Sequence, residues 1–179
     1  MSETSLFLIA DLHGFSPQVG RLVSMMNYVR STTVSAVAGL GVPELDYLHD
    51  PQTNSIGALL LHIAAAEVGY QVATFDGREL TEQEKGQWGA ALELGERGTR
   101  EINGHELTYY FEKLEHVRAR TLAELGRRDD QWLEETATMS SGQPVNNYFK
   151  WFHVLSHELN HRGQIRWLRA RALQGPGTG

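Results

Sequence analysis

The chain has 179 residues, of which 41% are hydrophobic and 21% are charged, and its formal net charge is −6. A chain of this length buries one sizeable core, so residues 1–179 are predicted to form a single domain. The acidic balance argues against a nucleic-acid-binding protein, which needs a basic surface for phosphate contacts. The absence of cysteine excludes disulfides, thiolate metal ligands and a cysteine nucleophile.

Residues 1–15 are interpreted as an N-terminal extension. Their apolar stretch, residues 5–10, is too short for the core of a signal peptide and lacks basic flanks. No apolar run in the sequence approaches the ~18 residues that a membrane span requires. We therefore expect a cytoplasmic protein without membrane association.

Four long segments follow in which apolar residues recur at helical spacing. The first begins after Ser16, a predicted N-cap, has Pro17 in its first turn, and ends before Gly39. The second is apolar almost all round, which is typical of a central helix. The four segments cover approximately residues 17–37, 55–74, 105–125 and 145–173.

No segment alternates apolar and polar residues for long enough to predict a core strand. The predicted fold is therefore all-α, a four-helix bundle with long connections. Residues 75–104 are polar and interrupted by glycine, and we interpret them as a lid-like excursion with one short extra helix near residues 80–94. An irregular connection over residues 127–144 precedes the fourth helix, and residues 174–179 are predicted to be a flexible tail.

The fourth helix contains the sequence HELNH, residues 157–161, which satisfies the H-E-x-x-H pattern of zinc peptidases. His157 and His161 lie four residues apart on one face of the helix, so both imidazoles can reach one metal ion. A peptidase is nevertheless disfavoured. The extended peptidase pattern requires glycine and histidine where this chain has Gln164 and Trp167, and no strand is predicted that would align a peptide.

A third ligand must come from upstream, because few residues follow His161. His62 is the candidate, since it lies in the middle of the apolar second helix and has no polar partner on its own stripe. Facing helices in a bundle lie ~8–10 Å apart, a distance that imidazoles can bridge through a metal. The predicted metal ligands are therefore His62, His157 and His161, and the small residues Ala66 and Gly69 are predicted to leave space beside the ion for water or substrate.

The remaining polar residues near this site receive weaker assignments. His153 and Gln164 are predicted to line the cavity, the first one turn before His157 and the second by a hydrogen bond toward the ligands. Glu158 has two interpretations, a base that flanks the site or a solvated side chain, and together with His153 it is a catalytic candidate. The catalytic residue itself stays unassigned. Glu67 is assigned to packing or an inter-helix bond, and Gly163 to a close helix or subunit contact.

Two stretches, DPQTNSIGALLLHIAAAEVGYQ and NYFKWFHVLSHELNHRGQIRWLR, resemble the DinB-like superfamily of metal-binding four-helix bundles. The resemblance extends over most of the chain and is weakest across residues 75–104. It implies that the helices run up, down, down and up. By position it also makes His62, His157 and His161 the three metal ligands.

The resemblance has further implications for cofactor, partner and activity. It implies a bound divalent ion, with zinc or nickel favoured and with iron, manganese and copper also compatible, because imidazole ligands suit several of these metals. It also implies a homodimer. Some members of the superfamily are S-transferases or isomerases that use bacillithiol or mycothiol, and many have no known activity.

Two alternative functions are therefore predicted. The first is a metal-dependent S-transferase that acts with a low-molecular-weight thiol, which must arrive as a cosubstrate because the chain has no cysteine. The second is a non-catalytic, stress-related metal-binding or sensing dimer. A metal-dependent hydrolase is a weaker variant of the first.

Overall fold

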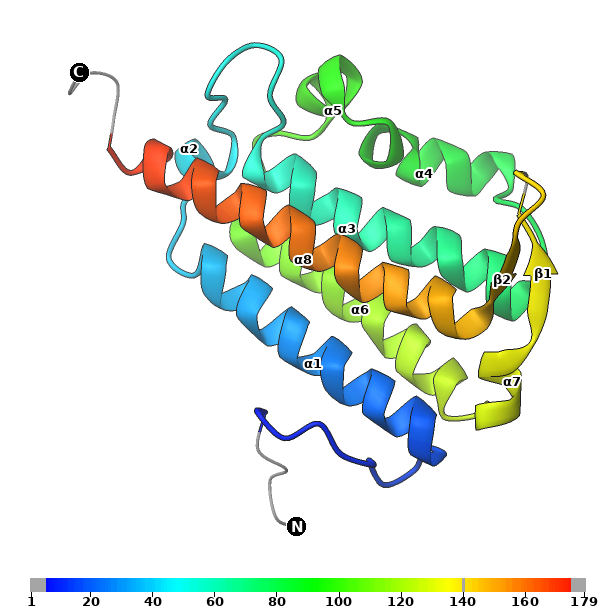
Figure 1. Ribbon diagram of the computed structural model, residues 1–179. Helices are drawn as coiled ribbons and strands as arrows, with labels where there is room; N and C mark the ends of the chain where they lie inside the picture. Colours follow the sequence, from blue (N-terminus) through cyan, green and yellow to red (C-terminus); the bar gives the residue numbers. More distant parts are fainter. Residues whose placement is uncertain (1–5, 140, 175–179) are drawn as a thin grey trace.

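The computed structural model describes residues 6–139 and 141–174 of the chain. Its four long helices are α1 (Pro17–Val37), α3 (Ile56–Gln71), α6 (Leu107–Leu125) and α8 (Asn147–Ala172). In Figure 1, α1 and α8 run in one direction, and α3 and α6 run in the other. The predicted up-down-down-up bundle is thus confirmed. The predicted tail falls almost wholly on residues 175–179, which lie outside the described residues, as do residues 1–5 of the extension.

Each ligand-bearing helix begins at a residue that caps its first turn. Ser55 Oγ accepts the Ala58 N–H of α3 at 3.1 Å, and Asn146 Oδ1 accepts the Phe149 N–H of α8 at 2.9 Å. Such side-chain caps satisfy backbone donors that have no partner within the helix. Both helices therefore start at positions defined by their own sequence.

The start of α1 differs in one respect from the prediction. Ser16 is the N-cap residue, but its side chain makes no capping bond to the helix. Its hydroxyl donates instead to Asp130 Oδ1 at 2.6 Å, and the same oxygen accepts the N–H groups of Gln18 and Val19 at 2.9 and 3.2 Å. Asp130, which begins the short helix α7 (Asp130–Glu134), thus caps α1 from a distant part of the chain.

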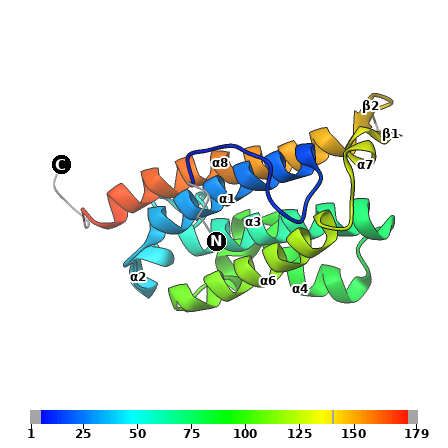
Figure 2. The same ribbon diagram turned by 90° about the horizontal axis from the view of Figure 1, so that it is seen from below.

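Helix α3 is the centre of the molecule. It contacts α6, α8 and the shorter helix α4 (Glu82–Glu93), and it lies between the α1/α8 pair and α6 in Figure 2. A π-helical turn, η1 (Val72–Asp76), extends it. Contrary to the prediction, the segment Ile56–Asp76 is long and apolar enough to cross a membrane by length and composition, but 72% of its apolar window is buried inside the bundle. That burial is the pattern of a core helix.

Several short elements were not predicted. They include α2 (Val42–Leu45) and α5 (Gly95–Glu101), together with a hairpin of β1 (Thr136–Thr138) and β2 (Pro144–Asn146). The hairpin strands are antiparallel, with Thr136 opposite Asn146. Three-residue strands are too short to show an alternating pattern, so no sequence periodicity reveals them.

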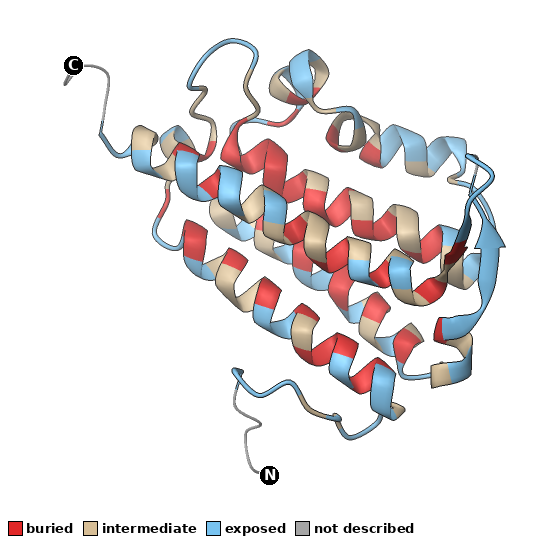
Figure 3. Ribbon diagram, viewed as in Figure 1, coloured by how far each residue is buried: buried red, intermediate tan, exposed pale blue. Residues whose placement is uncertain are grey.

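The excursion over residues 75–104 does not form a lid. Helix α4, predicted near residues 80–94, packs its buried side chains Trp88 and Ala91 against the bundle. Figure 3 shows buried residues on the inner face of this segment and exposed residues on its outer face. The lid-like interpretation is therefore wrong, since α4 packs against α3 and contributes to the core.

Candidate metal centre

Three histidines converge between α3 and α8. His62 projects from α3, and His157 and His161 project from successive turns of α8. The Nε2 atom of His157 lies 3.1 Å from Nε2 of His62 and 3.0 Å from Nε2 of His161. One ligand atom from each ring lies within 4.8 Å of the others, and all three side chains are half-buried. The predicted ligands are thus brought together at one point.

The outer nitrogens of two of these rings have fixed partners. His62 Nδ1 lies 2.7 Å from the backbone oxygen of Ala91 in α4, and His161 Nδ1 lies 2.8 Å from Gln164 Oε1. Because a carbonyl oxygen only accepts hydrogen bonds, each Nδ1 carries the proton and each Nε2 presents its lone pair inward. Such partners orient the ligands of metal sites. The predicted bond between Gln164 and the site is therefore present, with Gln164 as the acceptor, and the bond that the Ala91 carbonyl accepts from His62 is an unpredicted contribution of α4.

The site is electrostatically suited to a cation. Burial, followed by the influence of His161, His62 and His153, lowers the pKa of His157 to about 4. Burial also lowers the pKa of His62, although the Ala91 carbonyl opposes this effect. Both rings are therefore neutral at pH 7, with lone pairs available for coordination.

The spacing of the nitrogens also fits a metal ion. Four-coordinate zinc binds imidazole nitrogen at ~2.0–2.1 Å, which places tetrahedral ligand nitrogens ~3.3 Å apart. Two of the three separations, 3.0 and 3.1 Å, are close to this value, and the third is at most 4.8 Å. Three lone pairs that face one another at such distances repel unless a positive charge lies among them. The trio is thus consistent with a divalent metal site.

A cavity lies near the trio, and Gln164, which bonds to His161, is one of its lining residues, although none of the three histidines lines it. A cavity of about 560 Å³ is lined by residues of the loop before α3 and by α3 and α8, namely Thr53, Asn54, Leu59, Asn160, Gly163, Gln164, Trp167 and Leu168. A Cβ atom added at Gly163 would meet nothing within 4 Å. A close helix contact at Gly163 is therefore wrong, because this glycine faces the cavity, whereas the alternative of a subunit contact stays a prediction.

Of the predicted cavity residues only Gln164 lines this cavity; Ala66, Gly69 and His153 do not, although they lie on the same helix stripes as the ligands. Ala66 and Gly69 are only partly buried, and a Cβ atom added at Gly69 would meet nothing within 4 Å. The ring of His153 lies 6.0 Å from that of His157 and 5.8 Å from that of Tyr70, measured between centroids. Within the described ranges, neither ring nitrogen of His153 has a hydrogen-bond partner. His153 thus lies beside His157, one turn earlier on α8.

Glu158 is not the flanking base or the solvated side chain of the prediction. Its side chain is 1% exposed, and its carboxylate oxygens accept bonds from Arg30 Nε at 2.9 Å and from Arg118 Nη2 at 3.1 Å. One residue step turns a helix by ~100°, so Glu158 points into the bundle while His157 points toward α3. Because Glu158 is buried, pairs with two arginines and points away from the three histidines, it is withdrawn as a catalytic candidate.

Glu67 has the inter-helix role that was predicted for it. It is fully buried and accepts bonds from Arg118 at 2.8 and 3.1 Å and from Arg30 at 3.1 Å. Burial alone would raise the pKa of Glu67, but the two arginines and the Thr121 hydroxyl hold it below its usual value. Sequence reasoning missed the two arginines. The available signal was that Arg118 falls on the apolar stripe of its helix, one turn after Leu114.

Comparisons with known proteins agree with this fold. Residues 21–174 match the family described as Mycothiol-S-transferase. A crystal structure described as a conserved protein from Enterococcus faecalis is similar to the chain with a TM-score of 0.67 and 16% sequence identity, over 86% of this chain and 95% of the other. That likeness shows the fold alone, and no curated protein matches the chain. Because the family match spans most of the sequence and includes the three histidines, the chain belongs to the Mycothiol-S-transferase family.

Proposed function

We propose that the protein is a metal-dependent S-transferase that acts with a small thiol. The observation that carries the proposal is the convergence of three imidazole Nε2 atoms in a chain of the Mycothiol-S-transferase family. A divalent ion supplies the ability to lower the pKa of a coordinated thiol, so that a nucleophile is available at neutral pH. Zinc or nickel is proposed as the ion because all three ligands are imidazole nitrogens.

The sulfur must come from a cosubstrate, since the chain contains no cysteine. The family description points to mycothiol, which we propose as this cosubstrate. In the transfer, the thiol loses its proton and the sulfur forms a bond to an electrophilic carbon. The leaving group departs with the electron pair of the bond that breaks. His153 is proposed to accept the thiol proton, because its ring lies beside His157 and has no hydrogen-bond partner among the described residues.

We assign the electrophile to the cavity near the trio. Its volume of about 560 Å³ is within the range of ~300–1,000 Å³ that is typical of small-molecule sites. Two lining residues connect it to the ligands, because Leu59 lies one turn before His62 and Gln164 bonds to His161. Since an added side chain at Gly163 would point into open space, this position allows the cavity to be filled without disturbing the packed core.

Cobalt-substituted protein is expected to report thiol binding directly. Addition of mycothiol should produce a sulfur-to-metal charge-transfer band in the near ultraviolet, and a panel of electrophiles should reveal mycothiol-dependent turnover. Gly163→Leu should keep the band and lose turnover, because it fills the cavity and leaves the three histidines in place. Absorbance titration and product analysis by mass spectrometry measure the two effects.

The same experiment separates the alternatives. Bacillithiol, glutathione and coenzyme A serve as competing thiols, and a band with one of these but not with mycothiol would reassign the cosubstrate. A silent spectrum with all four thiols, together with the absence of thiol-dependent turnover, contradicts the S-transferase proposal. The non-catalytic metal-binding or sensing role would then take its place, or the hydrolase if turnover requires only water.

We also propose that two copies of the chain associate. The apolarity of α3, on which the prediction partly rested, is used within the bundle. Exposed apolar side chains remain elsewhere, however, including Phe149 and Phe152 on one turn of α8, which are 50% and 48% exposed. Sedimentation velocity at tens of micromolar is expected to show a dimer, and Phe152→Glu should shift it toward monomer. A monomer in the unsubstituted protein counts against the proposal.

A further inference from the structure

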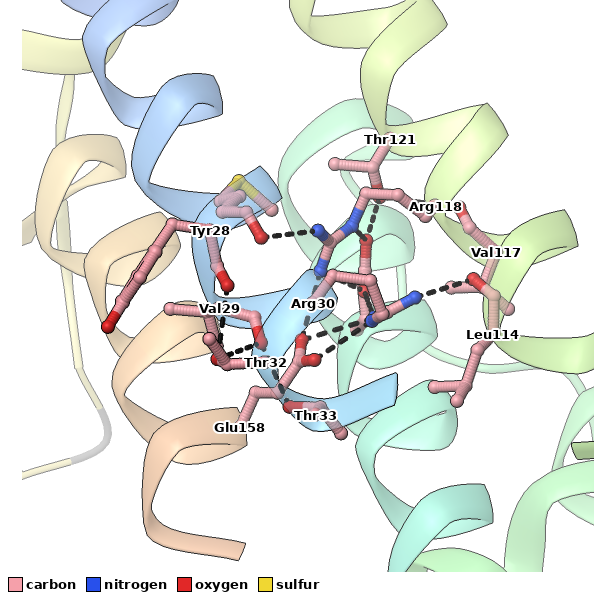
Figure 4. Close-up of polar contacts among 12 residues, drawn as sticks. Tyr28, Val29, Arg30, Thr32, Thr33, Leu114, Val117, Arg118, Thr121 and Glu158 are labelled. Atoms are coloured by element: carbon pink, nitrogen blue, oxygen red, sulfur yellow. Dashed lines mark hydrogen bonds and ion pairs between the residues drawn. The ribbon is translucent and has the colours of Figure 1, made fainter. Parts of the chain in front are cut away.

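Four charged side chains, three of them buried and the fourth mostly so, join the four long helices on the side of α8 away from the metal ligands. Arg30 belongs to α1, Glu67 to α3, Arg118 to α6 and Glu158 to α8, and we call them the buried quartet. Figure 4 shows Arg30 and Arg118 directed from their helices toward Glu158. Side-chain exposure is 13% for Arg30, 8% for Arg118 and at most 1% for the two glutamates. The quartet carries two positive and two negative charges and is therefore neutral overall.

The bonds within the quartet are directional. Arg30 binds both oxygens of Glu158, at 2.9 and 3.1 Å, and donates to Glu67 at 3.1 Å. Arg118 binds both oxygens of Glu67, at 2.8 and 3.1 Å, and donates to Glu158 at 3.1 Å. Each arginine thus makes a two-pronged contact with one glutamate and a single bond to the other. Such planar pairs define orientation as well as distance.

Further bonds attach the quartet to the helix backbones. Arg30 Nη1 donates to the carbonyl oxygen of Leu114 at 2.9 Å, and Arg118 Nη1 donates to that of Met26 at 3.2 Å. The Thr121 hydroxyl donates to Glu67 at 2.6 Å. The arginines of α1 and α6 are therefore themselves held in place, and they act as fixed partners for the glutamates of α3 and α8.

The two helices that carry the metal ligands are the two that supply the glutamates. Glu158 directly follows His157, and Glu67 comes five residues after His62. On a rigid helix these steps correspond to rotations of ~100° and ~140°. When each glutamate points at the arginines, the histidine of the same helix must therefore point toward the gap between α3 and α8.

A small rotation of α3 or α8 is expected to disturb the metal site, because such a site tolerates only small displacements of its ligand atoms. A helix rotation of ~10° moves an atom ~6 Å from the axis by ~1 Å. A metal constellation has to be held within ~0.5 Å of its productive geometry. Net stability alone does not account for the quartet, because apolar residues of similar volume often stabilise a core as well as buried ion pairs do.

We propose that Glu67 and Glu158 are positioning residues that set the rotation of α3 and α8, and that they thereby determine where His62 meets His157 and His161. The inference rests on the proposed metal site. It adds that metal affinity depends on a polar cluster that contacts neither the ion nor the substrate. It also accounts for the glutamate of the H-E-x-x-H string without peptidase chemistry.

The test uses near-isosteric changes. Glu67→Gln is expected to weaken binding of zinc, measured by competition with a chromophoric chelator, by ~10- to 100-fold, the range seen when outer-shell groups are changed. Saturated binding should still reach the ratio of the unsubstituted protein. The visible d–d bands of the cobalt-loaded variant should shift, because the three nitrogens no longer converge at the same spacing. Glu158→Gln should have the same effects.

Leu22→Ala is the matched control for general destabilisation, because Leu22 is fully buried in α1 and lies outside the quartet. It should lower the melting temperature while zinc affinity and the cobalt spectrum stay unchanged. If the glutamine variants do not fold, Thr121→Val removes one bond to Glu67, and we expect a weakening of ~3-fold.

The outcomes distinguish this inference from the proposed metal site. If zinc affinity and the cobalt spectrum are unchanged in Glu67→Gln, the positioning role is overturned. If the glutamine variants are unfolded, the same result in Thr121→Val overturns it. A loss of affinity in Leu22→Ala equal to that in Glu67→Gln also overturns it. Retention of zinc by His161→Ala in the same titration would instead show that the metal site is misassigned.

Discussion

Replacing His161 with alanine is expected to abolish stoichiometric binding of a divalent ion. The residue supplies one of three converging nitrogens, and a site with two imidazoles loses both a ligand and the geometry that the third imposes. His161 is half-buried near the middle of α8, and alanine is the best helix former. Helical content should therefore stay close to that of the unsubstituted protein, as measured by circular dichroism.

Metal content is measured by elemental analysis of protein purified without a histidine tag. Zinc should raise the melting temperature of the unsubstituted protein, because it binds the folded state preferentially, and it should have little effect on the variant. His116→Ala is the matched control, since His116 is an exposed histidine within α6, away from the trio. Full metal retention in His161→Ala, with the control unchanged, would contradict the ligand assignment.

The long helices and the ligand trio could be predicted because their signals are local. Apolar residues at a period of 3.6 mark a helix wherever one face is buried, and α1 was predicted with its observed bounds, Pro17–Val37. The trio followed from the i,i+4 spacing of His157 and His161 and from the lack of a polar partner on the stripe of His62. Each of these observations needs only one segment of the chain.

The features that escaped prediction depend on contacts between distant segments. Asp130 caps α1 across 114 positions of sequence, and Ala91 orients His62 across 29. The spacing of apolar residues along the sequence gives no sign of either contact. The polar composition of residues 75–104 suggested a lid, although the two buried side chains Trp88 and Ala91 suffice to pack α4 against the bundle.

Glu158 shows why a motif alone misleads. Its place in the H-E-x-x-H string suggested a base, whereas its function in this fold depends on which helices face α8. Arg30 and Arg118, each on a buried stripe, were the signal that a carboxylate would be needed in the core. The spacing of histidines therefore predicted the ligands, but only the packing of four helices identifies the role of the residue between them.

Arg118→Met is expected to destabilise the fold by ~3–5 kcal/mol, the usual cost of removing one partner from a buried ion pair. The substitution leaves Glu67 and Glu158 with only Arg30 among the arginines of the quartet. Methionine keeps much of the side-chain length, so the loss reflects the uncompensated charge more than a cavity. Urea unfolding at pH 7, followed by circular dichroism, measures the change.

The pH dependence of the stability lost in Arg118→Met shows whether the loss comes from the unpaired charge. In the unsubstituted protein the pKa of Glu67 lies below the ordinary 4.5, so its contribution to stability is present above pH 4.5 and is lost as the pH falls through the lowered folded-state pKa. Without Arg118 the pKa of Glu67 should rise, and protonation should then relieve the unpaired charge. The stability difference between Arg118→Met and the unsubstituted protein is therefore expected to shrink as the pH is lowered from 7 toward 4.

Arg127→Met is the matched control, because Arg127 is 70% exposed and, among the residues that the structure describes, pairs only with Glu124. Exposed ion pairs contribute ~0–1 kcal/mol, so this variant should unfold close to the unsubstituted protein at every pH. A loss in Arg118→Met no larger than that of Arg127→Met would mean that water reaches the quartet and screens it. A large loss that does not vary between pH 7 and 4 would assign the effect to packing instead of charge.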